Sequence, residues 1–131
     1  MIHEVSFRVR YSETDAQGIV NNANYLSYFE VGRVEWLRAV GFSYKELEKK
    51  GYGFVVVEVR ASYRKAAFFD DELMLRTELA ELKRASLRFT YTLLRGEEVV
   101  ATGYTRHGCL DLATGKARRM PPELDAYRVE A

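Results

Sequence analysis

The residues best suited to chemistry lie close together near the N-terminus, where Glu13, Asp15 and Gly18 precede an apolar segment that begins near Asn22. The first N–H groups of a helix have no partners within the helix and carry partial positive charge, so they suit a developing oxyanion. A carboxylate beside them could act as a general base or as a nucleophile. The alternative is structural: Asp15 caps its own loop and Asn21 or Asn22 caps the helix, as Asx side chains commonly do.

The other candidates are weaker. Glu13 could share a site with Asp15, where mutual repulsion would raise one pKa, but we expect it at the surface. His107 and Cys109 are two residues apart on an expected strand and so share a face. A small buried thiol beside a packed histidine is commoner than a nucleophilic Cys–His pair. No spacing of histidines and carboxylates indicates a metal site, so we expect no metal.

Hydrophobic patterning predicts the elements that hold these residues. Residues 3–11 alternate as a half-buried strand, and residues 22–40 are apolar around well over half of a helix, which predicts a long, largely enclosed helix ending at Gly41. A short helix is expected over 43–49. Four more strands follow at about 53–63, 72–82, 85–95 and 98–111, with tight turns at Lys83–Arg84 and Gly96–Glu97. The order predicts an α+β fold in which one antiparallel sheet curls around the helix.

Length and composition limit what the chain can be. Its 131 residues predict a single domain over 1–131, and a net charge of +1 argues against a general nucleic-acid binder. No apolar run approaches the ~20 residues of a membrane span, and no signal peptide is visible. Since Cys109 is the only cysteine, no internal disulfide can form, and we expect a cytoplasmic protein. An open sheet leaves an exposed edge, so we also expect a homodimer or homotetramer.

The run Thr14-Asp15-x-x-Gly18-Ile19-Val20, followed by Asn24-Tyr25 and Tyr28-Phe29-Glu30, resembles the signature of the hotdog-fold acyl-CoA thioesterases. The most similar branch is the 4-hydroxybenzoyl-CoA thioesterase type, which includes the thioesterase associated with the bacterial Tol–Pal operon. The resemblance covers nearly the whole chain. It implies a hotdog subunit of about five strands around a long helix. It also implies hydrolysis of an acyl-CoA to free acid and CoA without a dissociable cofactor.

The resemblance also assigns roles to residues. Asp15 matches the catalytic aspartate, which acts directly as nucleophile or through an activated water. Asn22 matches the helix-start position whose backbone N–H polarises the carbonyl, although many relatives have His or an aromatic residue there. Gly18 would allow close approach of backbone and substrate. Tyr25 would contact the substrate, and we expect the acyl channel between subunits to be lined by Tyr25, Phe29 or Phe68.

A basic turn is matched as well. Lys83, Arg84 and Ser86 correspond to the turn that grips the phosphates of CoA in the family, where charge-assisted hydrogen bonds suit phosphate. The alternative is an ordinary solvated hairpin turn. We expect a second cluster, Lys116, Arg118 and Arg119, to be solvated surface. Arg64-Lys65, followed by Ala66-Ala67-Phe68-Phe69-Asp70-Asp71, resembles a family segment that adjoins the acyl channel.

Two other functions stay open at this stage. The fold alone permits a non-catalytic module that binds acyl-CoA or acyl carrier protein, although a pure binder has no need of Asp15. A dehydratase or hydratase on the same fold would use a histidine with an acidic or amide partner. His3 and His107 stand in the wrong contexts for that chemistry.

Overall fold

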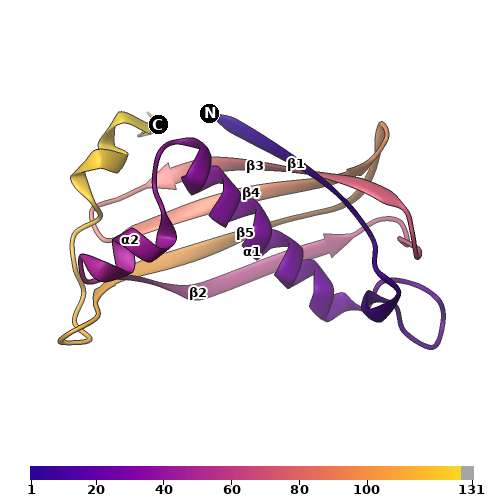
Figure 1. Ribbon diagram of the computed structural model, residues 1–131, viewed down its shortest axis with the longest axis horizontal. Coiled ribbons are helices and arrows are strands. Elements are labelled where there is room, and N and C mark those ends of the chain that lie inside the picture. Colours follow the sequence, from indigo (N-terminus) through magenta and orange to yellow (C-terminus); the bar gives the residue numbers. More distant parts are fainter. Residues whose placement is uncertain (128–131) are drawn as a thin grey trace.

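A computed structural model describes residues 1–127 and has the α+β hotdog architecture expected from the sequence (Figure 1). One antiparallel sheet runs in the order β1-β3-β4-β5-β2, with α1 lying across one of its faces. The strands are β1 (Ile2–Arg8), β2 (Tyr52–Tyr63), β3 (Glu72–Leu82), β4 (Ser86–Arg95) and β5 (Glu98–Asp111). The helices are α1 (Asn22–Ala39) and α2 (Tyr44–Lys49), with short 3₁₀ turns η1 (Tyr11–Glu13) and η2 (Pro122–Tyr127).

Aromatic side chains fix α1 to the sheet. The ring of Phe29 stacks on Tyr91 of β4 with centroids 4.3 Å apart, and Trp36 meets Phe89 edge-on at 5.4 Å. Gly32 lets the helix approach closely, because a Cβ there would lie only 2.4 Å from the Thr77 hydroxyl oxygen. These contacts form a core that orients α1 along the sheet, with its N-terminus at one end.

The helix is not enclosed on all sides, contrary to the sequence prediction. Leu26 and Val31 are 44% and 45% exposed, because the sheet covers only one face of α1. Leu26 shares a groove of about 230 Å³ with Val56 and Val59 of β2. The uncovered helix face therefore continues onto a strand that forms one edge of the sheet.

The first strand is shorter than expected. β1 ends at Arg8, and the chain then turns through η1, which leaves Tyr11 exposed. Val9 still pairs with the segment before β3, since its N–H donates to the Asp71 carbonyl at 2.9 Å. This early turn starts the loop that carries Asp15. Among residues 1–127, no helix has the length and apolar character to span a membrane.

His107 and Cys109 are core residues of β5 and lie near 2% and 1% exposure. The His107 Nε2 atom is 2.8 Å from the Thr105 hydroxyl oxygen. Burial, with a smaller contribution from Arg33, lowers the pKa of His107 to about 4, so the ring is neutral near pH 7. Burial raises the pKa of the Cys109 thiol, which agrees with a packing role for both residues.

Candidate active site

The loop between η1 and α1 is a small, closed structure. Thr14 and Val20 form an isolated antiparallel bridge at its base, and the Asp15 N–H donates to the Ile19 carbonyl at 2.9 Å. Gly18 turns the chain with a φ of +80°, a conformation in which any Cβ would be strained. The loop therefore presents Asp15 from a defined backbone position.

The Asp15 carboxylate is exposed and partly engaged. Its Oδ1 atom accepts the Gln17 N–H at 2.8 Å, which is an Asx turn. Its Oδ2 atom makes no hydrogen bond or ion pair within residues 1–127. The capping role and the chemical role considered from the sequence are therefore compatible, because one oxygen fixes the side chain and the other is open.

The start of α1 provides an unpaired donor. Asn21 is the N-cap, and its side chain accepts the Ala23 N–H at 3.0 Å. The Asn24 N–H bonds to the Asn21 carbonyl at 2.9 Å. In the part of the chain that the structure describes, the Asn22 N–H donates to no protein group. It lies in the first turn of the helix, where the macrodipole favours negative charge.

Asn22 opens onto a pocket of about 240 Å³ at the N-terminal end of α1. Its lining residues come from the loop, the helix and the segment after β2: Ile19, Val20, Asn22, Tyr25, Tyr63, Arg64, Lys65 and Ala66. Burial, and then the neighbouring Tyr63, raise the pKa of Tyr25, so its phenol keeps its proton. In one subunit, neither Asp15 nor Phe68 is among the lining residues, and Phe29 lies in the core instead of a channel.

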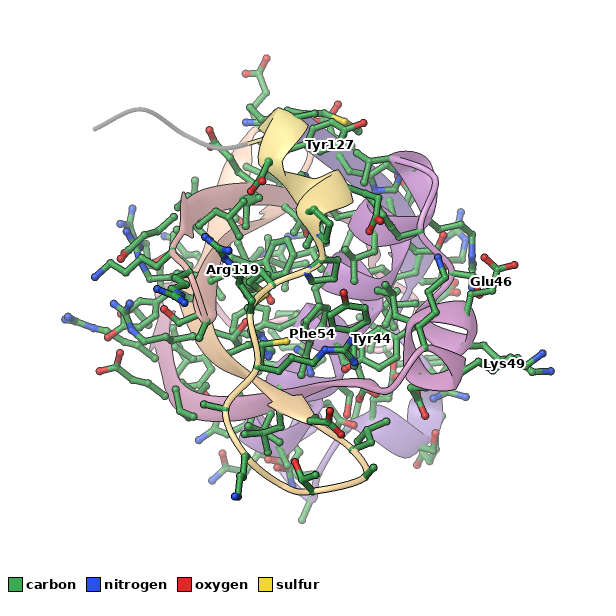
Figure 2. The ribbon with its side chains drawn as sticks, turned by 90° about the vertical axis from the view of Figure 1, so that its left-hand side faces the viewer. Tyr44, Glu46, Lys49, Phe54, Arg119 and Tyr127 are labelled. Carbon is green, nitrogen blue, oxygen red and sulfur yellow. The ribbon has the colours of Figure 1, made fainter. Side chains whose placement is uncertain are left out.

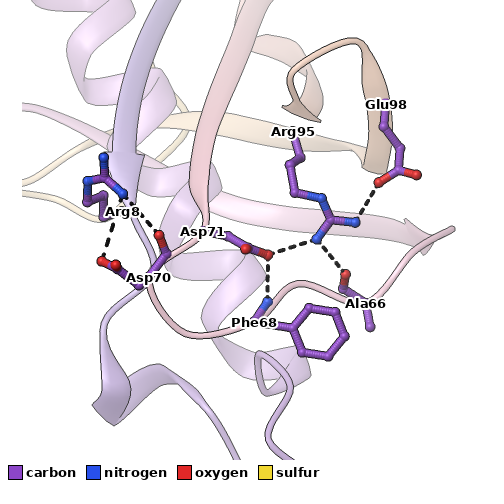
Figure 3. Close-up of polar contacts among 7 residues, drawn as sticks. All are labelled: Arg8, Ala66, Phe68, Asp70, Asp71, Arg95 and Glu98. Atoms are coloured by element: carbon purple, nitrogen blue, oxygen red, sulfur yellow. Dashed lines mark hydrogen bonds and ion pairs between the residues drawn. The ribbon is translucent and has the colours of Figure 1, made fainter.

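The segment after β2 is held in place by Arg95 (Figure 3). The Arg95 guanidinium donates to the Ala66 carbonyl at 3.0 Å and to the Asp71 carboxylate at 2.7 Å. The Val20 N–H in turn donates to the Ala67 carbonyl at 2.8 Å. One wall of the pocket is therefore tied both to β4 and to the loop that carries Asp15.

The basic turn lies at the other end of the sheet. The Lys83 N–H donates to the Ser86 carbonyl at 2.8 Å, and the Lys83 ammonium pairs with Glu81 at 2.9 Å. Arg84 faces a cavity of about 680 Å³, which neither Lys83 nor Ser86 lines. The cavity residues are Tyr52, Arg84, Arg118, Arg119, Met120, Pro122 and Asp125. Figure 2 views the molecule from this end, where Arg119 projects beside the C-terminal segment.

The second basic cluster is only partly solvated surface, which corrects the sequence prediction. The Arg118 guanidinium lies 3.7 Å from the Tyr52 ring centroid and donates to the Lys50 carbonyl at 2.9 Å. Arg118 and Arg119 also share the cavity with Arg84, which follows a different strand. Lys116 does not line this cavity. Tertiary structure therefore gathers three arginines at one place.

Asp15 and Arg84 lie at opposite ends of a subunit. Arg8, which leads to the loop, pairs with Glu72 at the start of β3, whereas Lys83 follows Leu82 at the end of β3. At ~3.3 Å per residue, β3 alone is about 33 Å long. The structure therefore brings Gly18 against Asp15, whose carbonyl accepts the Gly18 N–H at 2.9 Å, and places Asn22 and Tyr25 in a pocket that the same loop lines through Ile19 and Val20. It does not bring these residues to the basic turn of the same subunit.

Comparison with known proteins agrees with this architecture. The model of the thioesterase-like superfamily matches residues 9–127. The chain belongs to this superfamily. It is 38% identical over 120 residues to the acyl-CoA thioesterase YbgC of Haemophilus influenzae, covering 91% of this chain and 88% of that one. Among solved structures, it matches the hypothetical protein TT1821 of Thermus thermophilus with a TM-score of 0.92 and 34% identity, covering 99% and 100% of the chains. It also matches the DHNA-CoA thioesterase of Staphylococcus aureus with a TM-score of 0.87 and 29% identity, covering 96% and 83%.

Glu13 lies elsewhere than its position in the sequence suggested. Glu13 is not at the surface but 8% exposed, and its carboxylate accepts the Tyr28 hydroxyl at 3.0 Å. Burial and this hydrogen bond raise the pKa of Tyr28, which therefore stays a donor. The two partners are 15 residues apart on different elements. No local pattern could reveal the contact, because it depends on how the loop folds onto α1.

Proposed function

We propose that this enzyme hydrolyses acyl-CoA thioesters to a free carboxylic acid and CoA, and that Asp15 and the Asn22 backbone N–H act on the thioester carbonyl. Membership of the thioesterase-like superfamily supports thioester hydrolysis. The observation that carries the site is the unpaired N–H of Asn22 at a helix N-terminus, in a residue that lines a pocket beside the Asp15 loop. A donor in that position stabilises the negative charge that develops on the carbonyl oxygen.

Two balanced routes are available to Asp15. As a nucleophile, its oxygen bonds to the thioester carbon, the C–S bond breaks and CoA leaves as a thiolate; water then cleaves the anhydride and restores the carboxylate. As a general base, Asp15 takes a proton from water, whose oxygen attacks the carbon, and the proton leaves with the CoA sulfur. Both routes need only substrate and water, so we propose no cofactor. The open Oδ2 atom of Asp15 suits either route.

We assign the acyl group to the pocket at the start of α1. Tyr25 and Tyr63 form its aromatic side, with ring centroids 4.8 Å apart, and Gly18 keeps the neighbouring turn free of a side chain. We assign the CoA phosphates to the arginine cavity around Arg84, with Lys83 and Ser86 shaping the turn that presents it. Guanidinium groups recognise phosphate through paired charge-assisted hydrogen bonds.

These two half-sites require two subunits. β2 runs from Tyr52, which lines the arginine cavity, to Tyr63, which lines the acyl pocket. Antiparallel pairing of two β2 strands about a two-fold axis would bring Tyr52 of one copy near Tyr63 of the other. We therefore propose a homodimer whose active sites combine the Asp15 end of one subunit with the arginine end of its partner.

The edge strand supports this arrangement. Within residues 1–127, β2 pairs only with β5, so its other side presents unpaired backbone groups. Val55, Val56, Val57 and Val59 lie along it with 40–61% of each residue exposed. A long apolar edge is a template for pairing with another strand. The alternative of a hotdog dehydratase gains no support, because its histidine candidate His107 is buried in the core.

The test is thiol release from a panel of acyl-CoA thioesters by the wild type and by Asp15→Asn. This change keeps size and hydrogen bonding but removes the charge. We expect at least one substrate to be turned over, and kcat to fall by ~100-fold or more in the variant while CoA binding persists. Activity that survives Asp15→Asn would remove Asp15 from the mechanism. Binding of acyl-CoA without thiol release by either protein would favour the binding module.

A further inference from the structure

Glu13 is a buried acidic residue, and both of its carboxylate oxygens accept hydrogen bonds. Its Oε1 atom accepts the Arg10 backbone N–H at 2.8 Å and the Tyr28 hydroxyl at 3.0 Å. Its Oε2 atom accepts from the Arg10 guanidinium at 3.2 and 3.3 Å. Burying a carboxylate is unfavourable unless such partners replace water. The side chain is therefore placed for a structural or functional reason.

The backbone of Glu13 is tied to the same helix. Its carbonyl accepts both the Asn21 N–H and the Asn24 side-chain amide, each at 2.9 Å. Asn21 is the N-cap of α1, and Tyr28 lies further along that helix. Glu13 therefore contacts α1 through its side chain and through its main chain.

These contacts lie between the two groups that act on the substrate. Asp15 follows Glu13 by two residues, and Asn22 follows Asn21 by one. The bridge between Thr14 and Val20 closes the loop one residue after Glu13. Any shift of Glu13 relative to α1 changes the position of the Asp15 carboxylate relative to the Asn22 N–H.

We propose that Glu13 is a positioning residue that sets the geometry between Asp15 and the start of α1 through its Oε1 atom. The proposal rests on the role of Asp15 in the proposed function. The Arg10 guanidinium contributes little, since its side chain is 77% exposed and exposed ion pairs are weak. The two hydrogen bonds that hold Oε1, from the Tyr28 hydroxyl and from the Arg10 backbone N–H, form the tether that positions the loop.

A set of variants separates this role from stability alone. Glu13→Gln keeps a carbonyl oxygen that can accept from both donors, whereas Glu13→Ala and Tyr28→Phe break the tether. We expect kcat to fall by about 10- to 100-fold in Glu13→Ala, because small misplacements of reacting groups are costly. Tyr28→Phe should show a smaller fall in kcat. KM should stay within about twofold in both, and Glu13→Gln should recover most of the activity. Arg10→Ala is the matched control and should resemble the wild type.

The decisive measurement repeats Tyr28→Phe and Glu13→Ala in the Asp15→Asn background. A residue that acts through Asp15 has nothing left to position there, so the residual rate should not fall further. A further fall by the same factor, or a Glu13→Gln variant as impaired as Glu13→Ala, would overturn the proposal. Tyr28→Phe keeps the test informative if Glu13→Ala does not fold. If Asp15→Asn alone keeps full activity, the proposed role of Asp15 is wrong. That result differs from both outcomes of the double-variant test, so failure of the proposed function can be told apart from failure of the Glu13 proposal.

Discussion

The two ends of this subunit are built differently. At the Asp15 end, the loop is fixed by backbone hydrogen bonds, a buried carboxylate and an arginine that ties down the pocket wall. At the other end, Arg84 is exposed on a hairpin turn. Arg119 is exposed on the C-terminal segment (Figure 2). Within residues 1–127, Arg118 alone of the three arginines there has a side-chain contact that anchors it, with the Tyr52 ring and the Lys50 carbonyl.

The difference matches the roles that we propose for the two ends. Bond breaking depends on the position of a carboxylate and a donor to within fractions of an ångström, which needs a rigid frame. Phosphate binding uses charge-assisted hydrogen bonds, which exposed arginine side chains can supply. We therefore expect substitutions at the Asp15 end to change kcat, and those at the arginine end to change KM.

Breaking the proposed contact between two subunits should have the largest effect after loss of Asp15. Val57 lies on β2 with 61% exposure, and Val57→Lys would place a charge on the edge that we expect to pair. We expect a shift to monomer in analytical ultracentrifugation and a loss of activity on the order of 100-fold. Ile2→Lys on the opposite edge strand, β1, is the matched control and should stay dimeric. A fully active monomer would contradict a site shared between subunits.

Mixing two defective proteins tests the shared site directly. One chain carries Asp15→Asn and the other carries Arg84→Ala with Arg119→Ala. The assay uses substrate well below the wild-type KM, where each variant alone is impaired. Random exchange makes about half of the dimers mixed, and each mixed dimer has one intact site, so about a quarter of wild-type activity should return under these conditions. If both half-sites came from the same subunit, every site would keep one defect. Mixing would then restore nothing.

Removing the arginines should weaken binding without slowing the chemical step. We expect Arg84→Ala with Arg119→Ala to raise KM by about tenfold and leave kcat nearly unchanged, because phosphate contacts are the same before and during bond breaking. The wild-type KM should rise with salt, and the variant should show less salt dependence. Lys116→Ala, on the same segment but outside the cavity, serves as control. A fall in kcat instead would show that the two ends are not functionally separate.

The buried His107 should make the free energy of unfolding depend on pH. Since His107 lies in the core, this effect should leave the Asp15 end and the arginine end of the subunit unchanged. Its pKa is about 4 in the folded protein against 6.5 for an ordinary histidine, so the unfolded chain binds the proton more tightly. Stability from this group is complete above pH 6.5 and is lost as the pH falls towards 4, by up to about 3 kcal/mol at 1.36 kcal/mol per pH unit. Urea unfolding across this range should show a shallower decline in His107→Gln. Equal slopes in both proteins would contradict the assignment.

Most of the fold was predictable because its signals are local. Alternation and helical periodicity gave the strands and helices to within a few residues, and Gly41 and Gly96 have the positive φ values expected of a helix end and a tight turn. β1 is the exception, since the apolar pattern continues through Tyr11 while the backbone has already turned at η1. Periodicity records which side chains are apolar, and it does not record where pairing with β3 stops.

The residues of the site also separate into those that the sequence could identify and those that it could not. The sequence by itself identified Asp15, Gly18, Asn22 and Tyr25 as neighbours, because they lie within one loop and the first turn of one helix. Only the tertiary structure decided that Glu13 is buried against Tyr28, that Arg118 and Arg119 join Arg84, and that this cluster lies at the far end of the subunit. Contacts of that kind depend on strand order and on how a loop packs against a helix, and no short stretch of residues encodes either.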